Sequence, residues 1–296
     1  MVEGVFNTLL GGDSVKFTKM HGAGNDYALI DARDLDADWP SLARAMCHRR
    51  LGVGADGILL VLPSSSAHTR MRMFNPDGSE AEMCGNGIRC LAKYVLERGI
   101  VRRGESPLEV ETLAGVRALV PIWHDGRVIR ARVAMGKPEL RPDRVPVALP
   151  GGASDEPALD YPLTVEGVEL RLTFVGMGNP HAVAFLDAPV GEFPLPLIGP
   201  LVEHHLLFPN QVNFSIVNVG DPGHLSARVW ERGVGETLAC GTGSCAIAVA
   251  SRLHDYTDDE VDITLPGGVL TVAWDGRGQV YLEGPAEEVF EGEWNG

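Results

Sequence analysis

Two stretches of this chain align without a gap: residues 72–87, RMFNPDGSEAEMCGNG, and residues 228–243, RVWERGVGETLACGTG. Each residue of the first stretch has its counterpart 156 positions later, so Cys84 matches Cys240, and a glycine-rich turn follows each cysteine. This period is far longer than the roughly 20 to 50 residues of solenoid repeats. The alignment therefore indicates one duplicated domain and predicts two similar halves that each present one cysteine in the same place.

The repeat extends beyond these stretches. The sequence GNDY at 24–27 precedes GNPH at 178–181 by 154 positions, and Asp56 precedes Asn213 by 157. Runs rich in Val, Ile, Phe and Thr recur in both halves with short helical segments between them, which indicates a mixed α/β (α+β) architecture. We expect strands at 15–20, 27–31, 58–62, 69–74, 108–112 and 116–121, and again at 170–175, 182–186, 212–217, 225–230, 261–265 and 269–274.

Helices are expected to start at the two cysteines, over 84–97 and 240–253. The second is apolar or small on nearly all sides, which is typical of a buried helix inside a curled sheet. Two other helices, 40–50 and 195–207, occupy matching places in the halves and mix apolar with charged residues, as surface helices do. Residues 137–158 are rich in Pro, Gly and Asp, so this segment is the expected boundary.

Composition excludes several classes of protein. The 296 residues suggest about two domains. A net charge of −15 and a pI near 5.0 argue against a nucleic-acid binder, which needs a basic surface. No apolar run approaches the roughly 18 residues of a membrane span, and the first dozen residues do not resemble a secretory signal. Five cysteines, an odd number, indicate reduced thiols rather than a disulfide framework, so we expect a cytoplasmic protein.

The cysteine turns suggest a specific chemistry. A thiol is a good base only when it is ionised, and the start of a helix is expected to lower its pKa. The free amides after Cys84 and Cys240 can bind a carboxylate at the positive end of each helix. Two such turns around one α-carboxylate would place its neighbouring carbon between two thiols. That arrangement suits a reaction that removes a proton from one face of a carbon and returns one to the other.

Other readings of the cysteines are weaker. Cys47, Cys90 and Cys245 are interpreted as buried apolar side chains. The spacing of the cysteines misses the short pairs of a zinc site, and there is no Cys-x-x-Cys redox pair, so we expect neither a metal nor a redox function. Oxidation is nevertheless expected to be able to join Cys84 to Cys240 and to inactivate the protein.

Two other features of the sequence are a His/Glu pair near the cysteine turns and a glycine-rich stretch. His181 and Glu231 fall near the cysteine turns in the repeat and are candidates for setting the thiol pKa values, with an ordinary structural role as the alternative. The glycines of LGVGADG at 51–57 lack the Lys-Ser/Thr end of a phosphate-binding loop, so no nucleotide site is expected.

The motifs of both halves resemble those of the diaminopimelate epimerase family, in the family's order from residue 15 to about 290. The combination is highly specific, although Cys-Gly-x-Gly alone also occurs in proline racemase-like relatives. The first half carries KMHG at 19–22, GND at 24–26, GADG at 54–57, FNPDGSE at 74–80 and MCGNGIRC at 83–90. The second half carries GNPH at 178–181, VN at 212–213, ERGVGET at 231–237 and ACGTG at 239–243.

The resemblance implies interconversion of LL- and meso-2,6-diaminopimelate without a cofactor, in the biosynthesis of lysine and of peptidoglycan precursors. It implies that Cys84 and Cys240 act as acid and base and exchange these roles with direction, and that His181 and Glu231 adjust the thiols. The implied backbone contacts to the reacting α-carboxylate are at Gly85, Asn86, Gly241 and Thr242. The implied contacts to the distal amino acid group are at Asn25, Asn75, Asn179, Asn213, Glu231 and Arg232.

The resemblance also implies a domain organisation. The expected halves are 15–135 and 136–279, each a mixed β-sheet curled around a central helix, with the active site in the cleft between them. The last strand, in about 280–296, is expected to return to the first half, and residues 1–14 form an extension outside the family pattern. Some family members carry Gln where this chain has Gly57, so any substrate contact from that side chain is missing here. The expected partners are the small-molecule substrate and a second copy of the chain, with no nucleic acid and no membrane.

The sequence is also compatible with other functions. A relative acting on another α-amino or imino acid is the nearest, but a small cyclic substrate would not need the polar asparagine set. A non-catalytic ligand-binding protein could keep the carboxylate clamp without needing two thiols in register. A structural or interaction protein explains neither feature.

Overall fold

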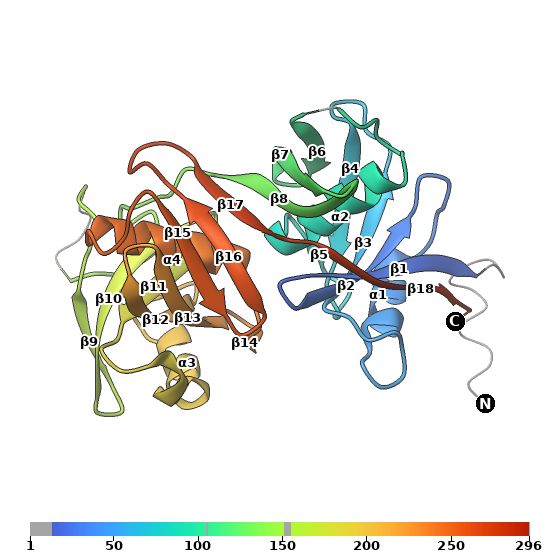
Figure 1. The fold of residues 1–296 in the computed structure, drawn as a ribbon. Helices are drawn as coiled ribbons and strands as arrows, with labels where there is room; N and C mark the ends of the chain where they lie inside the picture. The colour runs from blue at the N-terminus through green and yellow to red at the C-terminus, as the bar shows by residue number, and fades with distance from the viewer. Residues whose placement is uncertain (1–13, 105, 151–154, 296) are drawn as a thin grey trace, which may run out of the picture. The chain divides into compact units, whose positions relative to one another are not determined.

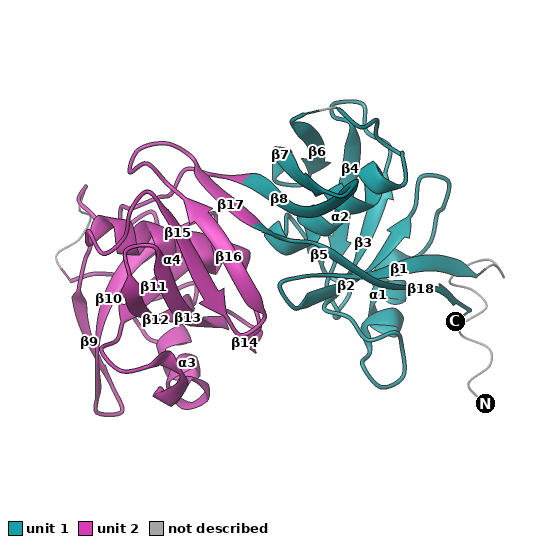
Figure 2. Ribbon diagram, in the orientation of Figure 1, with its two compact units in different colours: residues 1–133, 284–296 teal, residues 134–283 magenta. Residues whose placement is uncertain are grey.

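The computed structural model describes residues 14–104, 106–150 and 155–295. Nearly all of the expected 1–14 extension and residues 151–154 of the expected 137–158 boundary therefore lie outside the described residues. The chain forms two compact units, which Figure 2 distinguishes by colour. Unit 1 comprises Met1–Val133 and Gly284–Gly296, and unit 2 comprises Ala134–Glu283.

Unit 1 is a mixed sheet curled around one helix (Figure 1). Its strands pair in the order β18–β1–β2–β3–β4–β6–β7–β8, with the short β5 added to β4, and the β2–β3 and β4–β6 pairs are parallel. The strands are β1 (Val15–Gly22), β2 (Asn25–Asp31), β3 (Gly57–Leu62), β4 (Thr69–Phe74), β5 (Glu80–Ala81), β6 (Leu108–Thr112), β7 (Gly115–His124), β8 (Arg127–Gly136) and β18 (Glu287–Trp294).

Unit 2 repeats this topology strand for strand. The order is β9–β10–β11–β12–β13–β15–β16–β17, with β14 added to β13, and the β11–β12 and β13–β15 pairs are the parallel ones. The strands are β9 (Tyr161–Val165), β10 (Val168–Gly176), β11 (Pro180–Phe185), β12 (Asn213–Asp221), β13 (His224–Glu231), β14 (Gly235–Thr237), β15 (Glu260–Leu265), β16 (Gly268–Ala273) and β17 (Val280–Pro285). The predicted fold class is confirmed, because both sheets are mixed and the two units share one strand order.

The register of the strands shows which positions are equivalent. Tyr27 lies opposite Gly57 in the first parallel pair of unit 1, and His181 lies opposite Asn213 in the corresponding pair of unit 2. Asn213 therefore corresponds to Gly57, one residue from the Asp56 that the sequence comparison had matched to it. The predicted match of GNDY with GNPH agrees with this register.

Each unit contains one central helix that starts where the sequence predicts. These helices are α2 (Gly85–Glu97) and α4 (Gly241–Leu253), and nearly every residue of each is buried. α2 contacts β1, β2, β3, β4 and β7 of its own sheet, and α4 contacts β10, β11, β12, β15 and β16 of the other. A helix enclosed by a curled sheet has no solvent-facing side, which explains the almost uniformly apolar sequence of α4.

The two outer helices are shorter than predicted. They are α1 (Trp39–Cys47) and α3 (Leu195–Glu203), and both occupy equivalent positions in the repeat. α1 buries one face and exposes the other, as an amphipathic helix does. α3 is not the charged surface helix expected: it is apolar almost throughout and leaves Leu197 and Leu201 exposed.

Several strands lie outside the set expected from local sequence. The strand expected to return to the first half, near Val280 to Glu283, is instead β17 of unit 2, and the returning strand is β18. β8 alternates buried Val128, Ala131 and Val133 with arginines, which is the pattern of a half-buried strand. β18 has the sequence EEVFEGEW, whose many charges disfavour a strand, and its pairing with β1 comes from the opposite end of the chain. Tertiary pairing rather than local propensity forms this strand.

Candidate active site

Cys84 and Cys240 each cap the N-terminus of a central helix. The Sγ atom of Cys84 accepts a hydrogen bond from the backbone N–H of Gly87 at 3.5 Å, and Sγ of Cys240 accepts one from Gly243 at 3.4 Å. Both cysteines have extended backbone angles, as N-cap residues usually do. The helix dipole and the free amides therefore favour an anion at each turn.

The thiol of Cys84 lies against a tyrosine. The hydroxyl of Tyr27, on β2, is 3.0 Å from Sγ and also donates to Oδ1 of Asn25. Tyr27 is completely buried, and this burial, followed by the charge of Cys84, raises the pKa of its hydroxyl well above the usual range. Cys84 itself is partly exposed.

Asn25 connects this tyrosine to the start of α2 and to a charged cluster. Its Oδ1 atom accepts from Asn86 Nδ2 at 3.2 Å, and its Nδ2 donates to Oδ2 of Asp56 at 2.6 Å. Asp56 also accepts from Arg49 at 2.6 Å. The amide of Asn25 is thus held in one orientation by partners on both sides.

The same cluster includes a second carboxylate. Asp26 pairs with Lys19 at 2.6 Å and with Arg49 at 2.8 Å. Burial opposes ionisation of Asp26, but the hydrogen bonds from Arg49 and Lys19 outweigh it and hold its pKa below the usual range. The loop that carries Asn25 is therefore anchored by ion pairs.

Cys240 lies against a carboxylate instead. Its Sγ–H donates to Oε2 of Glu231 at 3.0 Å, and the other carboxylate oxygen accepts from Thr237 at 2.6 Å. Burial, followed by the charge of Glu231, raises the pKa of Cys240 well above the usual range. The expectation that the helix start lowers the pKa of both thiols is wrong for Cys240, because burial and a neighbouring anion outweigh the amide of Gly243.

His181 is buried near this turn but is bonded elsewhere. Its Nε2 atom lies 2.9 Å from Oδ1 of Asn179, and Asn179 in turn donates to Thr242 at 3.3 Å. Burial, followed by the positive charge of Arg232, lowers the pKa of His181 to about 3. The imidazole is therefore neutral near pH 7 and acts on its surroundings as a dipole rather than as a cation.

The remaining predicted residues of unit 2 are Asn213, at the start of β12, and Arg232, directly after β13. Asn213 Oδ1 accepts from the backbone N–H of Arg232 at 3.0 Å, and its Nδ2 donates to the carbonyl of Pro180 at 2.8 Å. The guanidinium of Arg232 donates to the carbonyl of Asn210 at 3.0 Å. Asn213 thus connects the loop after β13 to the start of β11.

In unit 1, Asn75 stands apart from the thiol. Its Nδ2 donates to Oγ of Ser79 at 3.0 Å, inside the turn that joins β4 to β5. The structure therefore links Cys84, Asn25 and Asn86 through Tyr27, and links Cys240 to Glu231 and Thr242, but it does not connect Asn75 to Cys84.

Three residues without an expected role support the Cys84 turn and the loop after β13. Tyr27 and Arg89 hold the turn of Cys84. The buried Arg89 guanidinium donates to Gly85 O at 2.9 Å and to Asn86 Oδ1 at 2.8 Å. Glu203, on α3, accepts from Trp230 Nε1 at 2.7 Å and from Gly233 N at 2.8 Å. For Glu203, the signal in the sequence is a single charged residue in an otherwise apolar helix, because an ionic group is buried only when it is well bonded. Arg89 has no such signal, since α2 also carries Lys93 and Glu97.

Gly57 has no room for a side chain. A Cβ atom there would lie 2.8 Å from the carbonyl oxygen of Phe74 and 3.1 Å from Met73 Cε. A glutamine at this position would need a shift of the β3–β4 pairing.

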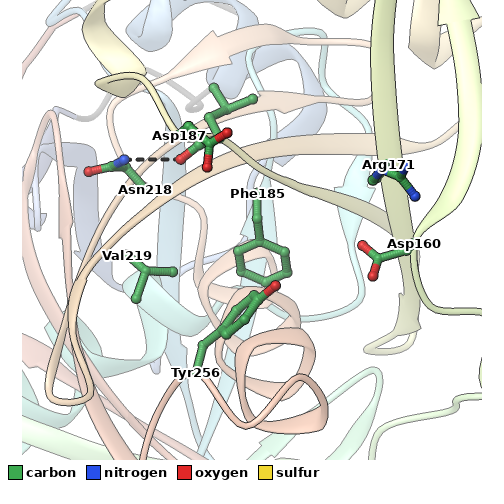
Figure 3. A pocket seen from close by; sticks show the side chains of 8 residues that line it. Asp160, Arg171, Phe185, Asp187, Asn218, Val219 and Tyr256 are labelled. Carbon is green, nitrogen blue, oxygen red and sulfur yellow. Dashed lines mark hydrogen bonds between the residues drawn. The ribbon is translucent and has the colours of Figure 1, made fainter.

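Two hollows lie away from the cysteine turns. One, of about 590 Å³, is in unit 2, where Figure 3 shows the rings of Phe185 and Tyr256 beside Arg171 and Asp160. Its wall also includes Asn218, whose Nδ2 donates to Leu186 O at 3.0 Å. The other, of about 600 Å³, is in unit 1 beside Arg98 and Glu288. Neither hollow includes a predicted site residue.

Within the described residues, no three His, Cys, Asp or Glu side chains are grouped as metal ligands. No helix in the described ranges is both long and apolar enough to cross a membrane.

Comparison with known proteins gives consistent results over almost the whole chain. The family model of diaminopimelate epimerase matches residues 17–141 and 173–289. A diaminopimelate epimerase of Moorella thermoacetica is 50% identical over 281 residues, which cover 94% of this chain and 98% of that protein. One of Methanococcus maripaludis is 44% identical, with coverage of 94% and 99%.

Solved structures share the fold at low sequence identity. A PhzF-family phenazine biosynthesis protein of Bacillus anthracis has a TM-score of 0.66 at 19% identity, covering 95% of this chain and 99% of that one. A probable proline racemase of Agrobacterium radiobacter, with bound carbonate, has a TM-score of 0.67 at 16% identity, covering 94% and 92%. These two structures support the architecture alone.

Proposed function

The chain belongs to the diaminopimelate epimerase family, and from this membership we propose that Cys84 and Cys240 are its acid and base. The protein is an isomerase that interconverts LL- and meso-2,6-diaminopimelate, a step in the biosynthesis of lysine and of peptidoglycan precursors. The observation that carries the assignment of the cysteines is their equivalence: both cap the N-terminus of a central helix in units of the same topology.

In the proposed reaction, one cysteine acts as a thiolate and removes the proton from the α-carbon. The other cysteine, as a thiol, gives its proton to the opposite face of that carbon. The first sulfur ends as a thiol and the second as a thiolate, so the pair has exchanged protonation states. The reverse reaction starts from this second state. Two groups are proposed because a thiol held in place on one face of the carbon cannot also exchange a proton with the opposite face.

The α-carboxylate is proposed to bind at the N-termini of α2 and α4, through Gly85, Asn86, Gly241 and Thr242. The support is the free amides at each turn together with the helix dipole, which stabilise a carboxylate and the negative charge that develops next to it. This requires the active site to lie between the two units, as the sequence analysis expects. Water must also be kept from the carbanion, so the proposal includes closure around the substrate.

The distal amino acid group is proposed to bind to Asn25, Asn75, Asn179, Asn213, Glu231 and Arg232. Arg232 can bind a carboxylate through paired hydrogen bonds, and Glu231 and the amide oxygens can accept from an ammonium group. Because Asn25 and Asn213 are already bonded within their units, they present only part of their hydrogen-bonding capacity to a substrate. His181 and Glu231 are proposed to tune the thiols, and no cofactor is included.

Deuterium exchange tests this function directly. Reduced protein is incubated with LL-diaminopimelate in D₂O, and deuterium at the α-carbon is followed together with the LL to meso ratio. We expect deuterium to appear in the meso product. A folded, reduced protein that forms neither deuterated nor meso product would contradict the substrate, and other α-amino and imino acids would then be compared.

We further propose a cytoplasmic location and a homodimer. The location follows from the need to keep both thiols reduced. For the dimer, the support is β18, which pairs with β1 and exposes the apolar side chains of Val289 and Phe290. Light scattering during gel filtration should give twice the chain mass for the wild-type protein and a lower mass for the Phe290→Asp variant. A monomeric wild-type protein would contradict the dimer.

A further inference from the structure

The surroundings of the two catalytic thiols differ at equivalent positions of the repeat. Tyr27 corresponds to His181 by strand register, and each is bonded to the equivalent asparagine, Asn25 or Asn179. Tyr27 in addition contacts the thiol of Cys84. Glu231 accepts from Cys240, whereas its counterpart Asn75 is bonded to Ser79. Each unit therefore uses a different strand to contact its thiol.

The two contacts have opposite chemical consequences. A carboxylate only accepts hydrogen bonds, so Glu231 stabilises Cys240 as a thiol and repels its thiolate. A phenol can both accept and donate hydrogen bonds. It can accept from the Cys84 thiol while donating to Asn25 Oδ1, or it can turn its proton toward a Cys84 thiolate. A hydrogen bond to an ionised acceptor is the stronger of these, so Tyr27 favours the thiolate.

The charged groups near the two thiols favour the same protonation states as these hydrogen bonds. Arg89 is fully buried on α2 and attracts a negative charge on Cys84. Its counterpart in unit 2, 156 positions later, is the uncharged Cys245. The other titratable groups that act on Tyr27 are Cys90 on α2 and Asp56 before β3. Burial keeps Tyr27 protonated, so its proton remains available to Cys84.

We propose that Tyr27 is a positioning residue that stabilises the Cys84 thiolate, so that the substrate-free enzyme holds Cys84 as the base and Cys240 as the acid. This inference rests on the proposed function of the two thiols. After a turnover that starts from this state, Cys84 carries the substrate proton and Cys240 is a thiolate next to Glu231. Loss of the Cys84 proton to water and uptake of one by Cys240 restore the starting state, and Tyr27 favours that return.

Tyr27→Phe tests this role, because it removes the hydroxyl and keeps the ring. The readout is the pH dependence of iodoacetamide alkylation of Cys84 and Cys240 without substrate, by peptide mass spectrometry. We expect the midpoint for Cys84 to rise by about one to two pH units, the scale of a hydrogen bond to a charged group, while that of Cys240 stays unchanged. kcat should fall more than KM changes, and the acidic limb of the pH–rate profile should move upward.

Tyr94→Phe is the matched control, since Tyr94 is a buried tyrosine of the same unit whose ring lies against Arg98. It should leave both midpoints unchanged. An unchanged Cys84 midpoint in a folded Tyr27→Phe protein overturns the inference, and so does an equal shift in Tyr94→Phe.

A second measurement does not depend on the folding of Tyr27→Phe. Thiolate absorbance is titrated in Cys240→Ser and in Cys84→Ser, each of which keeps one active-site thiol. Cys47 and Cys90 do not interfere, because burial raises the pKa of each to about 12. We expect the thiolate of the Cys240→Ser variant, which retains Cys84, to form at a lower pH than the thiolate of Cys84→Ser, which retains Cys240. The reverse order contradicts the proposal. These titrations need no substrate, so their outcome is separate from the deuterium exchange that tests the proposed function.

Discussion

Cys84 and Cys240 are equivalent in sequence but have different neighbours. Both cap a helix, yet one lies against a phenol and the other against a carboxylate. Position in the repeat identifies the two cysteines that we propose as acid and base, while residues from other strands determine the surroundings of each thiol.

Replacing either cysteine by serine should abolish most of the activity. We expect Cys84→Ser and Cys240→Ser each to lower kcat by orders of magnitude, because a serine hydroxyl is a far weaker acid and its alkoxide is not available near pH 7. The folds should remain intact, since the change is nearly isosteric. The measurement is deuterium exchange at the α-carbon with circular dichroism as the check on folding. Cys47→Ser, outside the cysteine turns, is the control, and a wild-type rate in either active-site variant would refute the two-base assignment.

Glu231→Gln should lower the pKa of Cys240. The charge of Glu231 is one cause of the raised pKa, so its removal favours the thiolate, although burial still opposes it. We expect Cys240 to be alkylated at lower pH than in the wild-type protein, as measured by peptide mass spectrometry without substrate. Glu169→Gln, an exposed carboxylate of the same unit, should have no effect. A Cys240 profile that does not move, or that moves upward, would contradict the contact.

Helix α3 contributes to the site although it carries no predicted site residue. Glu203 connects it to Trp230 and to Gly233, on either side of Glu231 and Arg232. An outer helix thereby fixes the loop that holds a thiol partner and a proposed substrate-binding arginine.

Glu203→Gln should loosen this loop. The amide has one acceptor oxygen for two N–H donors, so one buried donor loses its partner, at a cost of about 1 to 3 kcal/mol in the free energy of unfolding. We expect KM to rise more than kcat falls, because the loop carries the distal binding residues. Urea unfolding and steady-state kinetics measure the two effects. Glu192→Gln, an exposed residue shortly before α3, is the control, and unchanged stability and KM in Glu203→Gln would exclude this role.

The β-strands show where local sequence is sufficient. All twelve predicted strands are present, and both cysteine-led helices begin where expected. Only the family resemblance predicts a strand returning to the first half, because the acidic residues of β18 have low strand propensity and this strand is held by pairing with β1. Charged residues are expected in α3, but it is almost wholly apolar, and Leu195, Ile198 and Val202 pack in the core of unit 2.

At the scale of the whole chain, acid should destabilise the fold through His181. The unfolded histidine binds a proton below about pH 6.5, whereas the folded one stays neutral down to about pH 3. The unfolded state therefore binds more protons in this window, and the free energy of unfolding falls as the pH decreases, by at most about 1.4 kcal/mol per pH unit. Urea unfolding between pH 4 and pH 7.5 should show a smaller slope in His181→Gln than in the wild-type protein. The exposed His124→Gln should keep the wild-type slope, and equal slopes in all three proteins would contradict the burial of a neutral imidazole.

Oxidation should inactivate the protein. We expect a mild oxidant to join Cys84 to Cys240, which removes both the base and the acid, and a reductant to restore activity. Non-reducing peptide mapping with activity measured on the same sample tests this. Cys84→Ser should form no such bridge. Full activity in a sample with a proven bridge would overturn the proposed roles of the thiols.

The sequence by itself determined the duplication, the fold class, the two cysteine-capped helices and the family, because these depend on local propensity and on motifs that are contiguous in the chain. It could not determine that Tyr27 contacts Cys84, that Glu231 accepts a hydrogen bond from Cys240, that Arg89 supports the Cys84 turn, or that Glu203 supports the loop after β13. These contacts join residues from 9 to 57 positions apart, or bury a charge inside a helix, and they form only when the strands pair and the sheet encloses its helix. The positions of the two cysteines are thus a property of the chain, whereas the burial and the neighbouring charges of each thiol are created by the tertiary structure.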